Sequence, residues 1–189
     1  MTSEGNLPMF KGERISLKYA HVENERRFLI RSPFATTRGA RRLYIRDRYL
    51  IGTRLRLRRV EESGLPVVYK LGQKIRVDGS SLSKNAHTTI YLSADEFDLL
   101  AHLPANELEK TRWVNPIGNL ILSIDEFGGS LVNLVLAEVD LGNTGTLPAM
   151  FPIDLNDEVT NDERFTGGTL AKTTAEELTD ILNSFNLRP

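Results

Sequence analysis

The stretch Arg54-Leu-Arg-Leu-Arg58 alternates a charged side chain with an apolar one at every position. Successive side chains of an extended strand point to opposite faces, so three guanidinium groups share one face and two leucines share the other. The stretch Leu136-Ala-Glu-Val-Asp-Leu141 repeats this pattern with the opposite sign, because Glu138 and Asp140 share a face. Individual strand faces are therefore strongly charged.

The composition of the whole chain hides this pattern. Its 189 residues include 24 Lys and Arg against 25 Asp and Glu, a net charge of −1 that argues against a uniformly basic nucleic-acid binder. The absence of cysteine excludes a disulfide scaffold, a thiolate zinc site and a thiol nucleophile. No apolar run is long enough to span a bilayer, and the N-terminus lacks the apolar core of a secretory signal. We expect residues 1–189 to form a single domain of a cytoplasmic protein.

The charges are segregated along the sequence. Nine arginines and one acid, Asp47, lie between Arg38 and Arg59, whereas ten acids and three bases follow from Glu138 onward. This separation predicts that the two regions meet in space, with an anionic ligand and a metal cation as further partners.

Short runs of period two predict eight strands. They are His21–Ile30, Arg42–Leu50, Thr53–Val60, Val67–Val77, His87–Leu92, Lys110–Val114, Leu120–Phe127 and Leu131–Leu141. Capping boxes at Ser93–Glu96 and Thr174–Glu177 predict helices over about 94–103 and 174–186. A third helix is expected over Asn161–Lys172, although Gly167-Gly168 weakens it.

Charged strand faces on an open sheet would simply face water. Like charges there repel and gain little, because exposed ion pairs contribute roughly 0–1 kcal/mol. Several such strands favour a closed barrel whose lumen carries the charge. The predicted class is therefore α+β, mainly β: a closed eight-stranded antiparallel barrel with a few peripheral helices.

The candidate lumen holds seven bases and five acids, a surplus of two positive charges that one or two divalent cations would raise to match a triphosphate. The bases are Arg27, Arg54, Arg56, Arg58, Lys70, Lys110 and Arg112, and the acids are Glu23, Glu25, Asp125, Glu138 and Asp140. Carboxylates suit the hard ions Mg²⁺ and Mn²⁺, and guanidinium groups bind phosphate bidentately.

The chain resembles the CYTH superfamily, also called the triphosphate tunnel metalloenzymes, over roughly residues 20–172. The family's E-x-E-x-K strand is matched by Glu23-Asn-Glu-Arg-Arg27. Later landmarks follow in order: Tyr49-Leu50 before Arg54 and Arg56, Lys70, Lys110-Thr-Arg112, Asp125, Leu136–Asp140 and Val159–Phe165. Residues 1–19 form an N-terminal extension outside the resemblance.

The resemblance implies an eight-stranded tunnel that binds a triphosphate with Mg²⁺ or Mn²⁺. The metal ligands it implies are Glu23, Glu25, Glu138 and Asp140, and Asp125 is either a further ligand or a partner that orients one. The implied phosphate-binding residues are Arg27, Arg54, Arg56, Lys70, Lys110 and Arg112, which Arg58 is expected to join; Lys70 and Arg27 are the expected catalytic residues.

Three positions depart from the family pattern. Arg27 replaces the lysine of the motif, and an arginine does not readily release a proton. Asp140 stands where glutamate is common, which shortens its reach. The strand over 87–92 lacks the usual acids and carries His87 instead, so a lumenal His87 is one option.

The leading functional hypothesis is metal-dependent hydrolysis of an inorganic or organic triphosphate. An adenylate cyclase is the runner-up, and a non-catalytic polyphosphate- or nucleotide-binding module is a third option. Nucleic-acid binding through Arg38–Arg59 is not expected, because three of those arginines are assigned to the lumen. The substrate, the metal count and the oligomeric state stay open, with a homodimer as one option.

Overall fold

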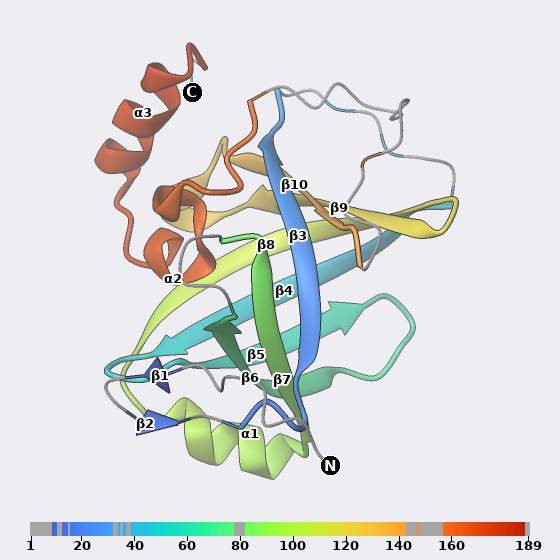
Figure 1. Ribbon diagram of the computed structural model, residues 1–189, viewed down its shortest axis with the longest axis vertical. Coiled ribbons are helices and arrows are strands. Elements are labelled where there is room, and N and C mark those ends of the chain that lie inside the picture. The colour runs from blue at the N-terminus through green and yellow to red at the C-terminus, as the bar shows by residue number, and fades with distance from the viewer. Residues whose placement is uncertain are drawn as a thin grey trace.

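Eight antiparallel strands close into a barrel in the computed structural model (Figure 1), which confirms the predicted fold class. The structure describes residues 9–10, 13–14, 16–31, 34, 36, 39–77, 82–142, 147 and 157–187. The barrel strands are β3 (His21–Leu29), β4 (Arg41–Leu50), β5 (Leu55–Glu62), β6 (Val68–Arg76), β7 (Lys84–Leu92), β8 (Ala105–Ile117), β9 (Leu120–Phe127) and β10 (Val135–Asp140). Their order around the barrel is β10-β3-β7-β6-β5-β4-β8-β9, and β9 pairs with β10 to close the ring.

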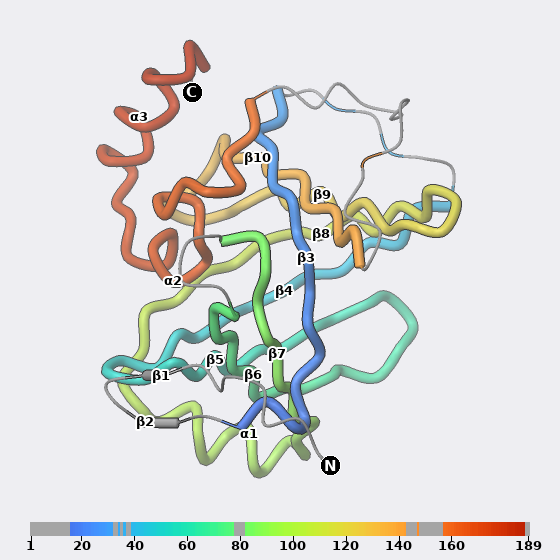
Figure 2. Tube along the Cα trace, viewed as in Figure 1, coloured from blue at the N-terminus to red at the C-terminus, as the bar shows by residue number. Residues whose placement is uncertain are grey.

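The strand that opens the barrel and the strand that completes it lie side by side. Figure 2 shows β3 and β10 running together although more than a hundred residues separate them. Their register places Glu138 opposite Arg27 and Asp140 opposite Glu25. The predicted meeting of the arginine-rich and acid-rich regions occurs in the lumen, where Arg54, Arg56 and Arg58 line the same cavity as Glu138. A separate two-stranded sheet comprises β1 (Met9–Phe10) and β2 (Glu13–Arg14).

Both predicted capping boxes are present. Ser93 and Glu96 cap α1 (Ala94–Ala101), and Thr174 and Glu177 cap α3 (Ala175–Ser184). The expected third helix over Asn161–Lys172 is instead broken into the 3₁₀ turn η2 (Glu163–Phe165) and the short α2 (Gly167–Leu170). The break is at Thr166, whose backbone is extended and whose carbonyl accepts the hydrogen bonds that begin the next turn.

Several strand boundaries differ from the sequence pattern. β8 begins at Ala105 rather than Lys110, and β7 begins at Lys84 rather than His87, because polar residues at these ends pair through backbone hydrogen bonds without apolar alternation. β10 begins only at Val135, since the 3₁₀ turn η1 (Gly129–Leu131) takes up the start of the expected strand.

The lumen changes from charged to apolar along its axis. On β3, the face that carries Glu23, Glu25 and Arg27 ends at Leu29, which is 1% exposed. Leu29 belongs to a buried cluster with Leu136 of β10 and with residues of η2, α2 and α3, including Phe165. The C-terminal segment therefore plugs one end of the barrel, which leaves the charged part of the lumen as the candidate site.

A second apolar cluster lies on the opposite face of β3, β9 and β10 and includes Phe28, Ile124 and Val139.

Among the described residues, no helix is long and apolar enough to cross a membrane. Most of the predicted N-terminal extension, and Arg38 of the arginine-rich stretch, lie outside the described residues.

Candidate functional site

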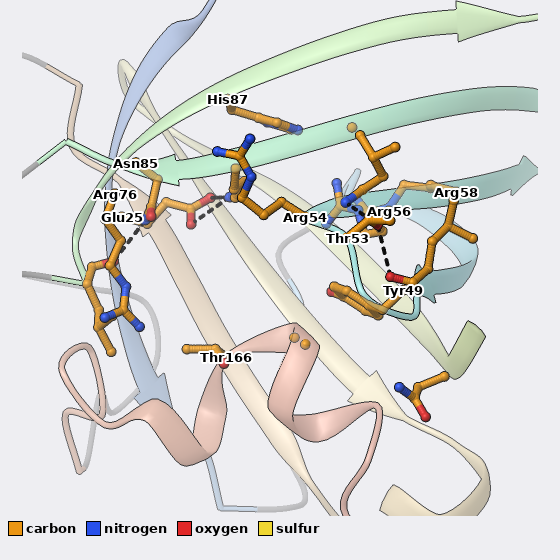
Figure 3. A pocket seen from close by; sticks show the side chains of 18 of the residues that line it. Glu25, Tyr49, Thr53, Arg54, Arg56, Arg58, Arg76, Asn85, His87 and Thr166 are labelled. Atoms are coloured by element: carbon orange, nitrogen blue, oxygen red, sulfur yellow. Dashed lines mark hydrogen bonds and ion pairs between the residues drawn. The ribbon is translucent and has the colours of Figure 1, made fainter. Parts of the chain in front are cut away.

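A cavity of about 460 Å³ occupies the charged part of the lumen (Figure 3). Basic side chains dominate its lining, with nine of them against three carboxylates, a surplus of six positive charges. The basic residues are Arg27, Arg54, Arg56, Arg58, Lys74, Arg76, Lys110, Arg112 and Lys172, and the acids are Glu23, Glu25 and Glu138. The cavity can therefore accommodate an anion with several charges.

A buried carboxylate on β4 holds the arginines of β5. Asp47 is 1% exposed and accepts hydrogen bonds from Nε and Nη2 of Arg58, both at 2.6 Å, while Arg56 Nε lies 3.7 Å away. Burial alone would raise the pKa of Asp47, but the charges of Arg58 and Arg56 keep this pKa well below its ordinary value. Asp47 is therefore ionised and fixes the orientation of the arginines.

A second buried carboxylate, on β9, holds the bases of β8. Asp125 is fully buried, and it accepts hydrogen bonds from Lys110 Nζ at 2.5 Å and from Nε and Nη2 of Arg112 at 2.6 Å. Burial, followed by the positive charge of Arg112, lowers the pKa of Lys110 despite the attraction of Asp125. Asp125 therefore orients two cavity-lining bases without lining the cavity itself.

The carboxylate of Glu138 on β10 lies between two arginines. Its Oε1 accepts a hydrogen bond from Arg27 Nε at 3.0 Å, and its Oε2 accepts one from Arg112 Nη2 at 2.6 Å. Burial would raise the pKa of Glu138, but Arg112 and Arg27 hold it well below its ordinary value. Glu138 therefore links Arg27 of β3 to Arg112 of β8 through its two carboxylate oxygens.

The two carboxylates of β3 share one lysine. Lys74 Nζ on β6 lies 2.6 Å from Glu23 Oε2 and 3.0 Å from both carboxylate oxygens of Glu25. Burial would lower the pKa of Lys74, but the charges of Glu25, Glu23 and Glu138 raise it. The ammonium group is therefore the counter-ion of the Glu23–Glu25 pair.

An imidazole from β7 completes the surroundings of Glu23. His87 lines the cavity, and its Nδ1 lies 2.9 Å from Glu23 Oε1. Burial opposes ionisation of Glu23, but the hydrogen bond with His87 and the charge of Lys74 lower the pKa of this glutamate to about 2. His87 lies on β7, the strand on which the family pattern predicts acids. It contacts Glu23 on β3, the neighbouring strand of the barrel.

Tyr49 at the end of β4 connects the arginines to the C-terminal segment. Its hydroxyl accepts a hydrogen bond from Arg56, and burial raises the pKa of the phenol. Figure 3 shows Tyr49 close to Arg56 and Arg58, with Thr166 across the cavity. Gly167 of α2 packs so tightly against this ring that a Cβ there would lie 2.0 Å from the hydroxyl oxygen.

Most of the predicted site residues converge on the cavity, but three do not. Glu23, Glu25, Glu138, Arg27, Arg54, Arg56, Arg58, Lys110 and Arg112 line it, whereas Lys70, Asp125 and Asp140 do not. Lys70 lies four residues before Lys74 on β6, with its Nζ 5.1 Å from the centre of the exposed Tyr91 ring. Asp140 turns to the backbone, where its Oδ1 accepts hydrogen bonds from the amides of Asn24 at 3.1 Å and Gly142 at 2.9 Å.

The structure also adds residues to which the sequence pattern assigned no role. Lys74 and Arg76 lie on the same face of β6 as Lys70, and alternation along that strand could have indicated them. Asp47 was visible as the single acid within the arginine-rich stretch. Tyr49 was one of the landmarks of the family resemblance, but its role depends on a contact with a residue more than a hundred positions away.

The candidate metal ligands do not form a preassembled metal centre. Among the residues that the structure describes, no three His, Asp or Glu side chains converge in a way that would hold an ion. The carboxylates of Glu23, Glu25 and Glu138 are instead engaged by Lys74, Arg27 and Arg112. Even so, Glu23 Oε2 is buried and accepts no hydrogen bond of good geometry, although Lys74 Nζ lies close to it.

Solved structures of the protein NE1496 share this barrel. One, described as a hypothetical protein, is 23% identical, covers 80% of this chain and 99% of that chain, and has a TM-score of 0.52. The other, described as the inorganic triphosphatase NE1496, is 24% identical, covers 80% and 95%, and has a TM-score of 0.53. A protein from Bacillus halodurans described as a "putative adenylate cyclase" is 14% identical, covers 89% and 92%, and has a TM-score of 0.47.

No family model matches the sequence, and none of the curated proteins matches it significantly. At these identities the likeness to NE1496 concerns the fold. It confirms the barrel fold that the resemblance implies.

Proposed function

We propose that the cavity binds a triphosphate chain and that the protein hydrolyses it with the help of Mg²⁺ or Mn²⁺. The observation that carries this proposal is the surplus of six positive charges in the lining of a closed barrel. A triphosphate carries roughly four to five negative charges, and its transfer chemistry depends on positioning and charge stabilisation. The similarity to NE1496, an inorganic triphosphatase, supports the same substrate class.

The bases of β5 and β8 would bind the phosphate oxygens. Asp47 fixes Arg58, and Asp125 fixes Lys110 and Arg112, so these donors hold their orientation before a substrate enters. Such preorganised donors stabilise charge that develops during the reaction without the cost of reorientation. The lowered pKa of Lys110 makes its ammonium group a better proton donor to a leaving phosphate oxygen than an exposed lysine would be.

The carboxylates Glu23, Glu25 and Glu138 would hold the metal. Their oxygens are the ligands that Mg²⁺ and Mn²⁺ prefer, and the poorly satisfied Glu23 Oε2 is consistent with a cation at this position. A bound divalent ion supplies charge neutralisation to the phosphate oxygens. The Asp140 carboxylate accepts a hydrogen bond from the Asn24 amide, so in our proposal it stabilises the pairing of β3 with β10 and does not bind the metal.

The arginines outside the lumen give little support to nucleic-acid binding. Arg41 pairs with Glu62, Arg48 with Glu107 and Arg59 with Glu61. Paired arginines of this kind offer a weaker field to a phosphate backbone than an unopposed basic patch does.

The direct test is phosphate release from tripolyphosphate with Mg²⁺ or Mn²⁺. We expect turnover in the wild type, no turnover in EDTA, and a loss of at least about 100-fold in Glu138→Ala, since removal of a preorganised charge commonly costs that much. Glu107→Ala, which removes an acid outside the cavity, is the matched control and should retain activity. Turnover that survives both EDTA and Glu138→Ala would refute the proposal.

Parallel assays separate the remaining alternatives. Incubation with ATP followed by detection of cyclic AMP tests a cyclase, and a panel with thiamine triphosphate tests an organic substrate. Tight tripolyphosphate binding without any turnover would instead identify a binding module.

A further inference from the structure

Lys74 holds a position that a metal ion bound by β3 would need. Its Nζ lies within 3.0 Å of carboxylate oxygens of both Glu23 and Glu25. A divalent ion binds carboxylate oxygens at about 2.0–2.2 Å, so an ion shared by these two glutamates would lie where the ammonium group now lies. Two cations cannot share that position, because their mutual repulsion at such a distance is large.

We propose that Lys74 is an exchangeable counter-ion: it neutralises Glu23 and Glu25 until a triphosphate draws it away, and the metal then takes its place. This inference rests on the proposed function and adds a coupling between the two ligands. The metal ion and the triphosphate bind cooperatively, because Lys74 repels the metal ion and attracts the triphosphate.

The side chain is able to make this exchange. Lys74 is 33% exposed toward the cavity, whereas the basic residues anchored by Asp125 include Lys110 at 8%. A lysine is a compact charge on a flexible four-carbon stem, so its ammonium group can move while the strand stays in place. Among the described ion pairs, Lys74 is held by Glu23 and Glu25, and no carboxylate from outside the lumen competes for it.

The charges of the cavity favour the exchange in both directions. A triphosphate adds acceptors for the ammonium group in a cavity that already carries surplus positive charge. A departing Lys74 leaves Glu23 with His87 and Glu25 with Arg27, whose Nη2 lies 3.8 Å away, so both carboxylates lose their nearest cation. Carboxylates that lose a close counter-ion in a partly buried site attract a divalent ion strongly. Thermodynamic linkage requires that each ligand raise the affinity for the other by the same factor.

The test measures Mn²⁺ binding to the whole protein without triphosphate, by titration calorimetry and by electron paramagnetic resonance of free Mn²⁺. Lys74→Met should bind Mn²⁺ about tenfold more tightly than the wild type, within the usual range of coupling between sites. Lys74→Gln, which keeps a hydrogen-bond donor and removes the charge, should show the same direction. Lys70→Met is the matched control, because Lys70 lies on the same strand but outside the cavity, with its Nζ 5.1 Å from the centre of the Tyr91 ring; its Mn²⁺ affinity should change less than twofold.

A second titration uses tripolyphosphate in EDTA. The wild type should bind it, and Lys74→Met should bind it about tenfold more weakly, since the lysine is no longer available to the polyanion. Mn²⁺ affinity that stays equal or falls in both Lys74 variants overturns the exchange, even where the wild type binds and hydrolyses tripolyphosphate. Failure of the wild type to bind tripolyphosphate overturns the proposed function as well, so the two ideas fail through different measurements.

Discussion

The basic and acidic walls of the lumen are held in different ways. The basic wall, formed by Arg56, Arg58, Lys110 and Arg112 on β5 and β8, is anchored by Asp47 and Asp125, which are almost completely buried. The acidic wall, formed by Glu23 and Glu25 on β3, is held by Lys74, which itself faces the cavity. Partners of the basic wall are out of reach of a ligand, whereas the partner of the acidic wall is within reach.

This difference separates preorganisation from exchange. A donor fixed by a buried carboxylate keeps its geometry when the ligand enters, so it is suited to stabilising charge in the reaction. A carboxylate whose counter-ion lies in the cavity can change partners, so it is suited to receiving a metal. The following predictions test how far the contrast holds.

The largest effect is expected from the anchor of the basic wall. Asp125→Asn leaves the buried Lys110 without its carboxylate partner and Arg112 with Glu138 alone. Removing one member of a buried ion network costs about 3–5 kcal/mol of folding free energy. Urea unfolding at pH 7 measures this. Asp140→Asn is the matched control, because Asp140 bonds to backbone amides, and it should cost about 1 kcal/mol. Equal losses in the two variants would contradict the anchoring role of Asp125.

The charge of Glu23 in the acidic wall should make the free energy of unfolding depend on pH. The pKa of Glu23 falls from 4.5 to about 2 on folding, so its ionised form stabilises the native state above pH 4.5. That contribution is lost as the pH falls from 4.5 through about 2, and well below pH 2 the carboxyl is protonated in both states. Wild type should exceed Glu23→Gln by up to about 3 kcal/mol at pH 6, because each pKa unit corresponds to about 1.4 kcal/mol.

Urea unfolding of wild type and Glu23→Gln at pH 6, 4 and 3 measures this difference. It should narrow steadily over that range. A difference that stays constant with pH would mean that the glutamate contributes through packing rather than through its charge.

The contact between Gly167 and Tyr49 tests whether Tyr49 helps to fix Arg56 within the basic wall. The methyl group of Gly167→Ala would overlap the Tyr49 hydroxyl, and overpacking of this kind costs about 1–3 kcal/mol. We expect lower thermal stability together with a weaker affinity for tripolyphosphate, because the phenol can no longer hold Arg56. Tyr49→Phe in the Gly167→Ala background should recover part of the stability, since the overlapping oxygen is then absent.

The smallest effect is expected on the outer surface of the barrel. Glu107 is 65% exposed and pairs with Arg48, and exposed pairs contribute roughly 0–1 kcal/mol. Glu107→Gln should therefore change the folding free energy by less than about 1 kcal/mol in urea unfolding. A loss as large as that of Asp125→Asn would show that burial does not separate the two classes of ion pair.

Much of the barrel was predictable because charged and apolar side chains alternate along its strands, which indicates the face on which each side chain lies. The alternation in Arg54–Arg58 placed three guanidinium groups in the lumen, and the E-x-E spacing placed Glu23 and Glu25 on one face. Alternation gives the face of a side chain but not its height in the barrel. Lys70 and Lys74 share a face of β6 yet lie about 13 Å apart along the strand at 3.3 Å per residue, so the sequence pattern could not decide between them.

The remaining differences arise from contacts between distant segments. Asp140 has the residue type and the face of a metal ligand, but the turn after β10 brings the amide of Gly142 to its carboxylate. Asp47 is recognisable as an anchor only when β4 and β5 are paired in register, with Asp47 opposite Arg58. Strand register and tertiary turns decide these roles, and neither can be inferred from local sequence.

The pairing of β3 with β10 has a consequence for how the protein is made. During synthesis, β3 emerges more than a hundred residues before β10, its neighbour in the finished barrel. At roughly 5–20 residues per second, that edge of β3 waits on the order of ten seconds for its partner, and barrel closure is a late, long-range event. Until β10 pairs, the sheet has uncovered edges on both β3 and β9, and during this period a chaperone or an early ligand can influence the yield of folded protein.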